Sequence, residues 1–337
     1  MDQHQAEILG RDDEFGIVER RRQARFREGL SVPSDTIGRR HGYLLELGCE
    51  EENLYPTLRG TNGACRFFAD RKIRWWQSRR SGDTSDGQRP TRNMASSQIA
   101  CVNFLLPLIG IPEALRAVLQ ALDGDVISVV DIEHQGTSSP VELEWIGLDH
   151  ALEGLGVKTR GMHSTSVDAF MVAETRTGRR GYLIEWKYVE EYRTEDKGEG
   201  SRGETRRSRY AHLYANSPSF NGRVPFDAWL FEPFYQILRL RLLADRMVRN
   251  RELAISEAKV VVVVPEGNRA YLERVTSPWL ERVYPDRTVA EIVHETLVDP
   301  DRAYASVSPS VLAASVRQRC GTTAAPWSSY LHQRYGW

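Results

Sequence analysis

The sequence of 337 residues is poor in cysteine, in lysine and in long apolar runs. Its four cysteines lie far apart and form no CxxC pair, which argues against both a structural zinc site and a disulfide framework. The longest apolar runs, near residues 102–111 and 260–264, are far too short to span a membrane. Because the charged N-terminus does not resemble a signal peptide either, we expect a cytoplasmic protein without a membrane partner.

Net charge is also nearly absent, since the formal value at pH 7 is -1. Global charge therefore does not mark a nucleic-acid-binding protein, and any such binding has to come from local basic patches. The P-loop pattern GxxxxGK[ST] and the histidine spacings HxH and HExxH are missing as well. An NTP-driven motor and a histidine-based metallohydrolase are thus both disfavoured. With 41% hydrophobic and 9% aromatic residues, the chain can still bury a large core.

Composition divides the chain into three parts. Residues 1–90 form an N-terminal extension, in which the charged cluster at 19–28 predicts a solvated surface helix or arm. A Gly, Ser, Asp and Pro-rich linker at 81–91 leads into a core at 91–270. We expect residues 271–337 to be a C-terminal helical segment.

Hydrophobic periodicity within the core predicts helices that alternate with strands. The predicted helices are 96–106, capped by Ser96 or Ser97, then 112–122 and 229–247. The predicted strands are 126–132, 141–146, 166–174, 181–189 and 259–264. Residues 192–223 show no apolar periodicity and are predicted to be a long inserted loop. The fold class is α/β (α+β), with a mixed central sheet flanked by helices.

Two carboxylates and one ammonium are expected to meet in this sheet. The turn between Thr175 and Arg180 predicts an antiparallel hairpin, which brings Asp168 close to Glu185. Because side chains two apart share a face of a strand, Glu185 and Lys187 project together while Trp186 points away. Two carboxylates and a backbone carbonyl suit Mg²⁺, for which Mn²⁺ can substitute, with positions left for water and a phosphate oxygen.

Lys187 is one of only five lysines among 45 basic residues, so its place beside two acids carries some weight. A compact ammonium there can orient an attacking water and stabilise negative charge in the transition state. The residues thus predict phosphodiester hydrolysis at a metal site made by Asp168 and Glu185. The alternative is a surface hairpin that bears an ordinary ion pair, worth roughly 0 to 1 kcal/mol.

Asp168, followed seventeen positions later by Glu185-Trp186-Lys187, resembles the PD-(D/E)XK nuclease superfamily, although Val167 replaces the proline of that motif. Segments at 96–105, 141–145, 184–190 and 235–239 are similar to a poorly characterised bacterial branch of restriction-type endonucleases. The resemblance implies a restriction-endonuclease-like core and a Mg²⁺-dependent DNA endonuclease of restriction or defence type. The alternative function is a catalytically silent nucleic-acid-binding protein with the same fold.

Four further residues are candidates for supporting this site. The superfamily often places an additional acid or polar ligand where Glu144 and Gln98 lie, but Glu144 could equally be a solvent-facing strand residue. Glu190 either binds a second metal or caps the strand. Gln236 and its neighbour Arg239 either face phosphate or form an ordinary helix surface.

DNA contacts are predicted for the inserted loop, which combines phosphate-pairing charge with aromatic groups such as Tyr210. The arginines concerned are Arg202, Arg206, Arg207 and Arg209, and the alternative is that they are merely solvated. Arg179 and Arg180 lie at the hairpin tip, away from the site. Trp75 and Trp76 are interpreted as core or lid aromatics. The sequence leaves a homodimer open.

Overall fold

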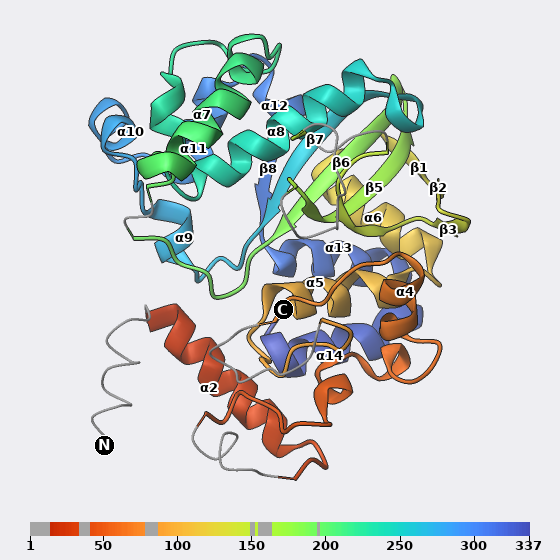
Figure 1. Cartoon of the computed structure of the whole chain (residues 1–337). Helices are drawn as coiled ribbons and strands as arrows, with labels where there is room; N and C mark the ends of the chain where they lie inside the picture. The colour runs from red at the N-terminus through yellow and green to blue at the C-terminus, as the bar shows by residue number, and fades with distance from the viewer. Residues whose placement is uncertain (1–13, 34–40, 78–86, 149–151, 154–163, 194–195) are drawn as a thin grey trace, which may run out of the picture.

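The structure is a computed structural model that describes residues 14–33, 41–77, 87–148, 152–153, 164–193 and 196–337. A mixed sheet lies at its centre, as the sequence predicts (Figure 1). Within the described residues the sheet has six strands in the order β1-β5-β6-β7-β8, and β4 also pairs with β5. The strands are β1 Val126–Val130, β4 Glu142–Trp145, β5 Val167–Thr175, β6 Gly178–Trp186, β7 Ile255–Val263 and β8 Tyr304–Val307. A separate ribbon pairs β2 Ile132–His134 with β3 Thr137–Ser139.

The predicted hairpin forms between β5 and β6, and Thr175 pairs with Gly178 at its tip. Gly178 has a φ of 129°, a backbone conformation that glycine adopts without strain. Strand β6 begins three residues earlier than the apolar pattern indicates, because Gly178 and Arg179 already pair with β5. The parallel pairing of β7 with β6 and β8 explains its valine-rich run, since parallel strands are buried on both faces.

Helices cover both faces of the sheet and form two apolar cores. One core contains Tyr182, Ile184 and Trp186 and is completed by α5 Ser97–Leu105, α6 Pro112–Leu122, α13 Pro309–Cys320 and α14 Ala325–Tyr335. The other contains Leu183 and is completed by α7 Gly200–Ala215, α8 Phe234–Arg249 and α11 Val289–Thr296. Ser96 caps α5 through its hydroxyl, which accepts a hydrogen bond from the Ile99 amide.

The remaining elements are shorter or lie at the periphery. The helices are α2 Glu14–Glu28, α4 Ala64–Asp70, α9 Arg269–Glu273, α10 Pro278–Val283 and α12 Pro300–Ala303. The 3₁₀ helices are η1 Glu50–Asn53, η2 Pro56–Leu58, η4 Leu106–Leu108, η5 Phe226–Trp229, η6 Glu252–Ala254 and η7 Gly321–Ala324. None of the helices in the described ranges is both long enough and apolar enough to cross a membrane.

Three expectations from the sequence are wrong in detail. The predicted loop 192–223 contains α7, whose lack of an apolar stripe hid it, because only Gly203 and Tyr210 are buried. The C-terminal segment is not purely helical, because β8 pairs with β7. The charged N-terminal cluster is not fully solvated, since Gln23 donates a hydrogen bond to the Tyr188 hydroxyl at 2.8 Å in the interior.

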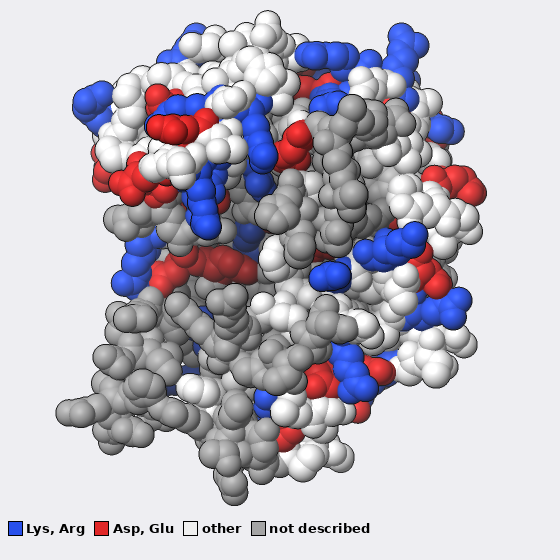
Figure 2. Space-filling model, viewed as in Figure 1, with Lys and Arg blue, Asp and Glu red and all other residues white. Residues whose placement is uncertain are grey.

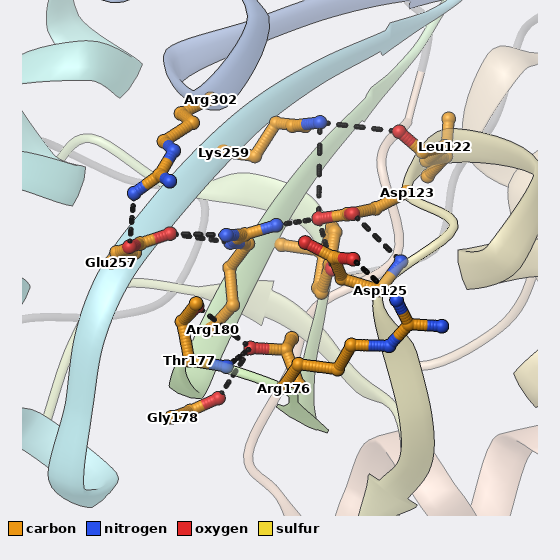
Figure 3. Close-up of polar contacts among 12 residues, drawn as sticks. Leu122, Asp123, Asp125, Arg176, Thr177, Gly178, Arg180, Glu257, Lys259 and Arg302 are labelled. Carbon is orange, nitrogen blue, oxygen red and sulfur yellow. Dashed lines mark hydrogen bonds and ion pairs between the residues drawn. The ribbon is translucent and has the colours of Figure 1, made fainter.

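A buried network of charges fastens the tip of the hairpin to its neighbours (Figure 3). The Arg180 guanidinium is 3% exposed and pairs with Asp123 after α6 and with Glu257 on β7. Lys259 donates to the Leu122 carbonyl at 3.1 Å, and Arg302 pairs with Glu257 at 2.8 Å. This network lies at the opposite end of β5 and β6 from Asp168 and Glu185, so the hairpin-tip arginines are remote from the site, as predicted.

Candidate functional site

Asp168, Glu185 and Lys187 lie together where β5 begins and β6 ends. The Asp168 Oδ2 atom accepts a hydrogen bond from the Trp186 amide at 2.7 Å, and Lys187 Nζ donates to Glu185 Oε1 at 2.7 Å. The Trp186 ring packs into the core on the other face of the sheet, as side-chain alternation predicts. The hairpin thus brings two carboxylates and one ammonium to a single place.

Neighbouring elements hold Glu185 and Lys187 in position. The Lys187 amide donates to the Val263 carbonyl at 2.8 Å, which fixes the end of β6 against β7. From α8, Gln236 Nε2 donates to Glu185 Oε1 at 2.6 Å. The alternative of a surface hairpin is wrong, because Glu185 and Lys187 are only 3% and 5% exposed. Their contact is a buried ion pair and not an ordinary surface one.

Glu144 on β4 joins this group through an unusual backbone conformation. Its φ is 47°, a left-handed value that costs energy for a residue other than glycine. Leu143 packs into one core and Trp145 into the other, although residues two apart normally share a face. The reversal at Glu144 separates them and leaves Glu144 itself buried, which excludes the solvent-facing alternative.

Three donors orient the Glu144 carboxylate. Gln98 Nε2 and Trp76 Nε1 both donate to its Oε1 at 2.8 Å, and the Ser166 hydroxyl donates to Oε2 at 3.1 Å. Trp75 stacks on Phe68 in the core, whereas Trp76 is half-exposed. Trp75 therefore belongs to the core and Trp76 to the site, whereas the sequence predicted core or lid aromatics without separating the two.

The surroundings of Asp168 and Glu144 disfavour the charged forms of these two carboxylates. Burial raises the pKa of Asp168 well above its usual value, and the nearby Glu185 raises it further. Burial also raises the pKa of Glu144, although its hydrogen bonds partly offset that effect. For Lys187, burial alone lowers the pKa, but Glu185 and other neighbours outweigh it, so the net pKa is raised and the ammonium keeps its proton. Such a site favours an added cation or proton.

These residues line one cavity of about 740 Å³. Asp168, Glu185 and Lys187 contribute to it from the sheet, and α7 contributes Arg202, Arg206 and Arg209. The three arginines are four and three residues apart, which is the spacing of one helix face. On the face of the molecule shown in Figure 2, basic and acidic side chains are interspersed.

Two predicted residues are not part of the cavity lining. Arg207 pairs with Asp227 at 2.7 Å and donates to the Gly198 carbonyl at 2.8 Å. Glu190 Oε2 accepts from the Tyr188 amide at 2.6 Å, which agrees with the strand-capping alternative. Ser166, which also lines the cavity, was missed, although its position two residues before Asp168 in the predicted strand 166–174 could have indicated it.

The donor set at Asp168 and Glu185 suits a hard cation but does not enclose one. Among the described residues, no group of three or more His, Cys, Asp and Glu side chains is arranged to hold a metal ion. A cation here would bind two carboxylates and take its other oxygens from backbone carbonyls and water. Mg²⁺ commonly binds proteins in this way, through one or two carboxylates and several waters.

The chain matches a known protein family over most of its length. A family model with the description "Restriction Endonuclease associating with ARP" matches residues 38–336, which include every candidate site residue. No curated protein and no solved structure matches the chain.

Proposed function

The chain belongs to the family of restriction endonucleases associating with ARP, and from this premise we propose that it is a metal-dependent endonuclease that hydrolyses DNA phosphodiester bonds. The observation that carries the proposal is the meeting of Asp168, Glu185 and Lys187 in one cavity. The family relationship favours a role in restriction or defence.

Asp168 and Glu185 would hold Mg²⁺ or Mn²⁺, which supplies stabilisation of phosphate charge and a bound water of lowered pKa. Lys187 stays protonated beside Glu185 and directs its positive charge to the place where negative charge develops on the phosphate. Because Glu185 already binds this ammonium, its position is fixed before substrate arrives, which is the condition for effective electrostatic stabilisation.

Asp168, Glu185 and Lys187 form a triad, and the residues around this triad orient it. Gln236 fixes Glu185 from α8, and Gln98 and Trp76 fix Glu144 beside it. Glu144 adds a third carboxylate that can orient water bound to the cation. A strained backbone at this residue agrees with a functional role, because such strain persists mainly where the site requires it.

Arg202, Arg206 and Arg209 would bind the DNA backbone. Arginine forms paired hydrogen bonds with phosphate oxygens, and the α7 stripe directs three guanidinium groups into the cavity that contains the triad. Arg207 would take no part, because it is already paired with Asp227 outside this cavity.

A cleavage assay tests the proposal. Wild-type protein is incubated with supercoiled, linear and single-stranded DNA in Mg²⁺, in Mn²⁺ and in EDTA. We expect cutting of at least one substrate in either metal and none in EDTA. DNA binding without cleavage under every condition would instead support the catalytically silent binding protein.

A further inference from the structure

Arg239 is a half-buried cation, with a fully buried Nε atom, that the mechanism above does not use. It lies on α8, three residues after Gln236, on the same face of the helix, and it lines the same cavity. Within the described part of the chain its guanidinium makes no hydrogen bond or ion pair, and its Nε atom is fully buried. The Cζ atom of its guanidinium lies 5.1 Å from the centroid of the Tyr235 ring.

Its buried Nε–H group is unusual, because buried polar groups normally have a hydrogen-bond partner. Arg241 on the same helix shows the ordinary case. Its Nε donates to Asp245 at 3.1 Å, and its Nη1 donates to the Ala258 and Ala303 carbonyls at 2.7 and 2.9 Å. Arg239 therefore differs from a structural arginine in the same element.

Two carboxylates near Arg239 have contacts with other groups. Glu153 accepts hydrogen bonds from the Tyr210 hydroxyl at 2.6 Å and from the Thr165 amide at 2.9 Å. Glu232 lies 3.8 Å from the Lys197 ammonium. Neither forms an ion pair with Arg239 among the described residues, so the guanidinium is open to an anion that enters the cavity.

We propose that Arg239 forms a subsite for the phosphate next to the scissile one, on the same strand of the substrate. This inference rests on the proposed nuclease function. Along α8, Arg239 lies about 4.5 Å beyond Gln236, which contacts Glu185, so a phosphate bound by Arg239 would be a neighbour of the one at Asp168, Glu185 and Lys187. A guanidinium binds phosphate through two parallel hydrogen bonds, which would give the unpaired Nε its missing partner.

Binding of modified oligonucleotides tests the subsite without any cleavage. A short single-stranded oligodeoxynucleotide is prepared in versions that each carry one neutral methylphosphonate, with the position moved along the strand. Affinities are measured in EDTA for wild type and for Arg239→Gln. In wild type, one position should weaken binding about ten- to hundred-fold, the usual effect of losing a charged hydrogen bond. Arg239→Gln should bind the unmodified strand more weakly than wild type does, by the same factor. The methylphosphonate at the sensitive position should then cause no further loss of affinity in this variant.

Arg249→Gln is the matched control, since it removes the same charge from the exposed end of the same helix. It should keep the position-specific loss. Thermal unfolding separates a binding role from a structural one, because Arg239→Gln should be at least as stable as wild type, whereas Arg241→Gln should be less stable.

Three results would overturn the subsite. They are equal binding of every oligonucleotide by wild type and Arg239→Gln, a position-specific loss that persists in Arg239→Gln, and a large loss of stability in that variant. The two proposals fail separately. A wild-type protein that cuts DNA but shows no dependence on Arg239 keeps the nuclease and loses the subsite. A protein that cuts nothing but shows the position-specific loss keeps phosphate binding by Arg239 and loses the nuclease.

Discussion

Replacing Arg202, Arg206 and Arg209 together by glutamine should reduce the salt dependence of DNA binding, whereas replacing Arg207 should not. All four residues lie on α7, but only the first three line the cavity that contains the triad. Arg207 is paired with Asp227 and with the Gly198 carbonyl. The helix therefore contains its own matched control.

The size of the effect follows from the number of phosphates that the helix neutralises. The logarithm of the DNA-binding constant falls linearly with the logarithm of the salt concentration. Each phosphate contact makes this slope steeper by about 0.9 for duplex DNA and by about 0.7 for a single strand. Three contacts give a decrease in slope of about 2 to 3 in the triple variant. For Arg207→Gln the expected change is about zero, because its charge is already compensated.

Fluorescence anisotropy of labelled DNA measures this slope in EDTA, over about 50 to 200 mM salt. Thermal unfolding of each variant checks the fold, since Arg206 also donates to the Lys197 carbonyl at 2.8 Å. If the triple variant keeps the wild-type slope, or if Arg207→Gln lowers it as much as a cavity arginine does, α7 does not bind the DNA backbone as we propose.

Two further predictions concern stability and pH. Arg180→Met leaves the Asp123 and Glu257 carboxylates without their main partner. It should lower the free energy of unfolding, measured in urea, by about 3 kcal/mol. A loss below about 1 kcal/mol would show that the network acts like a surface ion pair. Burial and Glu185 raise the pKa of Asp168, so below that raised value Mg²⁺ has to displace a proton. Apparent Mg²⁺ affinity, measured by calorimetry, should therefore rise with pH through the raised pKa and fall on acidification, and an affinity that does not change with pH would contradict this.

The hairpin and its triad could be predicted because local rules determine them. Side-chain alternation places Glu185, on β6, and Lys187, directly after it, on one face, and a short turn pairs β6 with β5. The valine run of β7 and the capped start of α5 are similarly local signals. Each depends on a few neighbouring residues and on no distant contact.

Other features depend on tertiary contacts that no local pattern shows. Helix α7 has few apolar residues, and Gly203 allows it to pass so close to the Gly198 carbonyl that a Cβ would lie 1.9 Å from its oxygen. The left-handed backbone at Glu144 is maintained by packing on both faces of the sheet, and sequence periodicity cannot reveal it. Strand β8 is only four residues long and is defined by its pairing with β7.

The burial of the site changes how it is best tested. Because Lys187 and Glu185 form a buried pair, truncation to alanine would leave a carboxylate without its cation, at a cost of about 3 to 5 kcal/mol. Lys187→Gln keeps an amide donor for Glu185 and removes only the charge, and Asp168→Asn keeps the shape of the acid. Both variants are therefore preferable to alanine.

The rate of plasmid cleavage in Mg²⁺ by wild type and Lys187→Gln, measured alongside DNA affinity at fixed salt, tests the nuclease assignment most directly. We predict a fall in cleavage rate of about 10²- to 10³-fold, as for the loss of one preorganised transition-state contact, with little change in affinity. Asp168→Asn should abolish both cleavage and Mg²⁺ binding. If Lys187→Gln cuts the plasmid as fast as wild type, these residues are not the cleavage site.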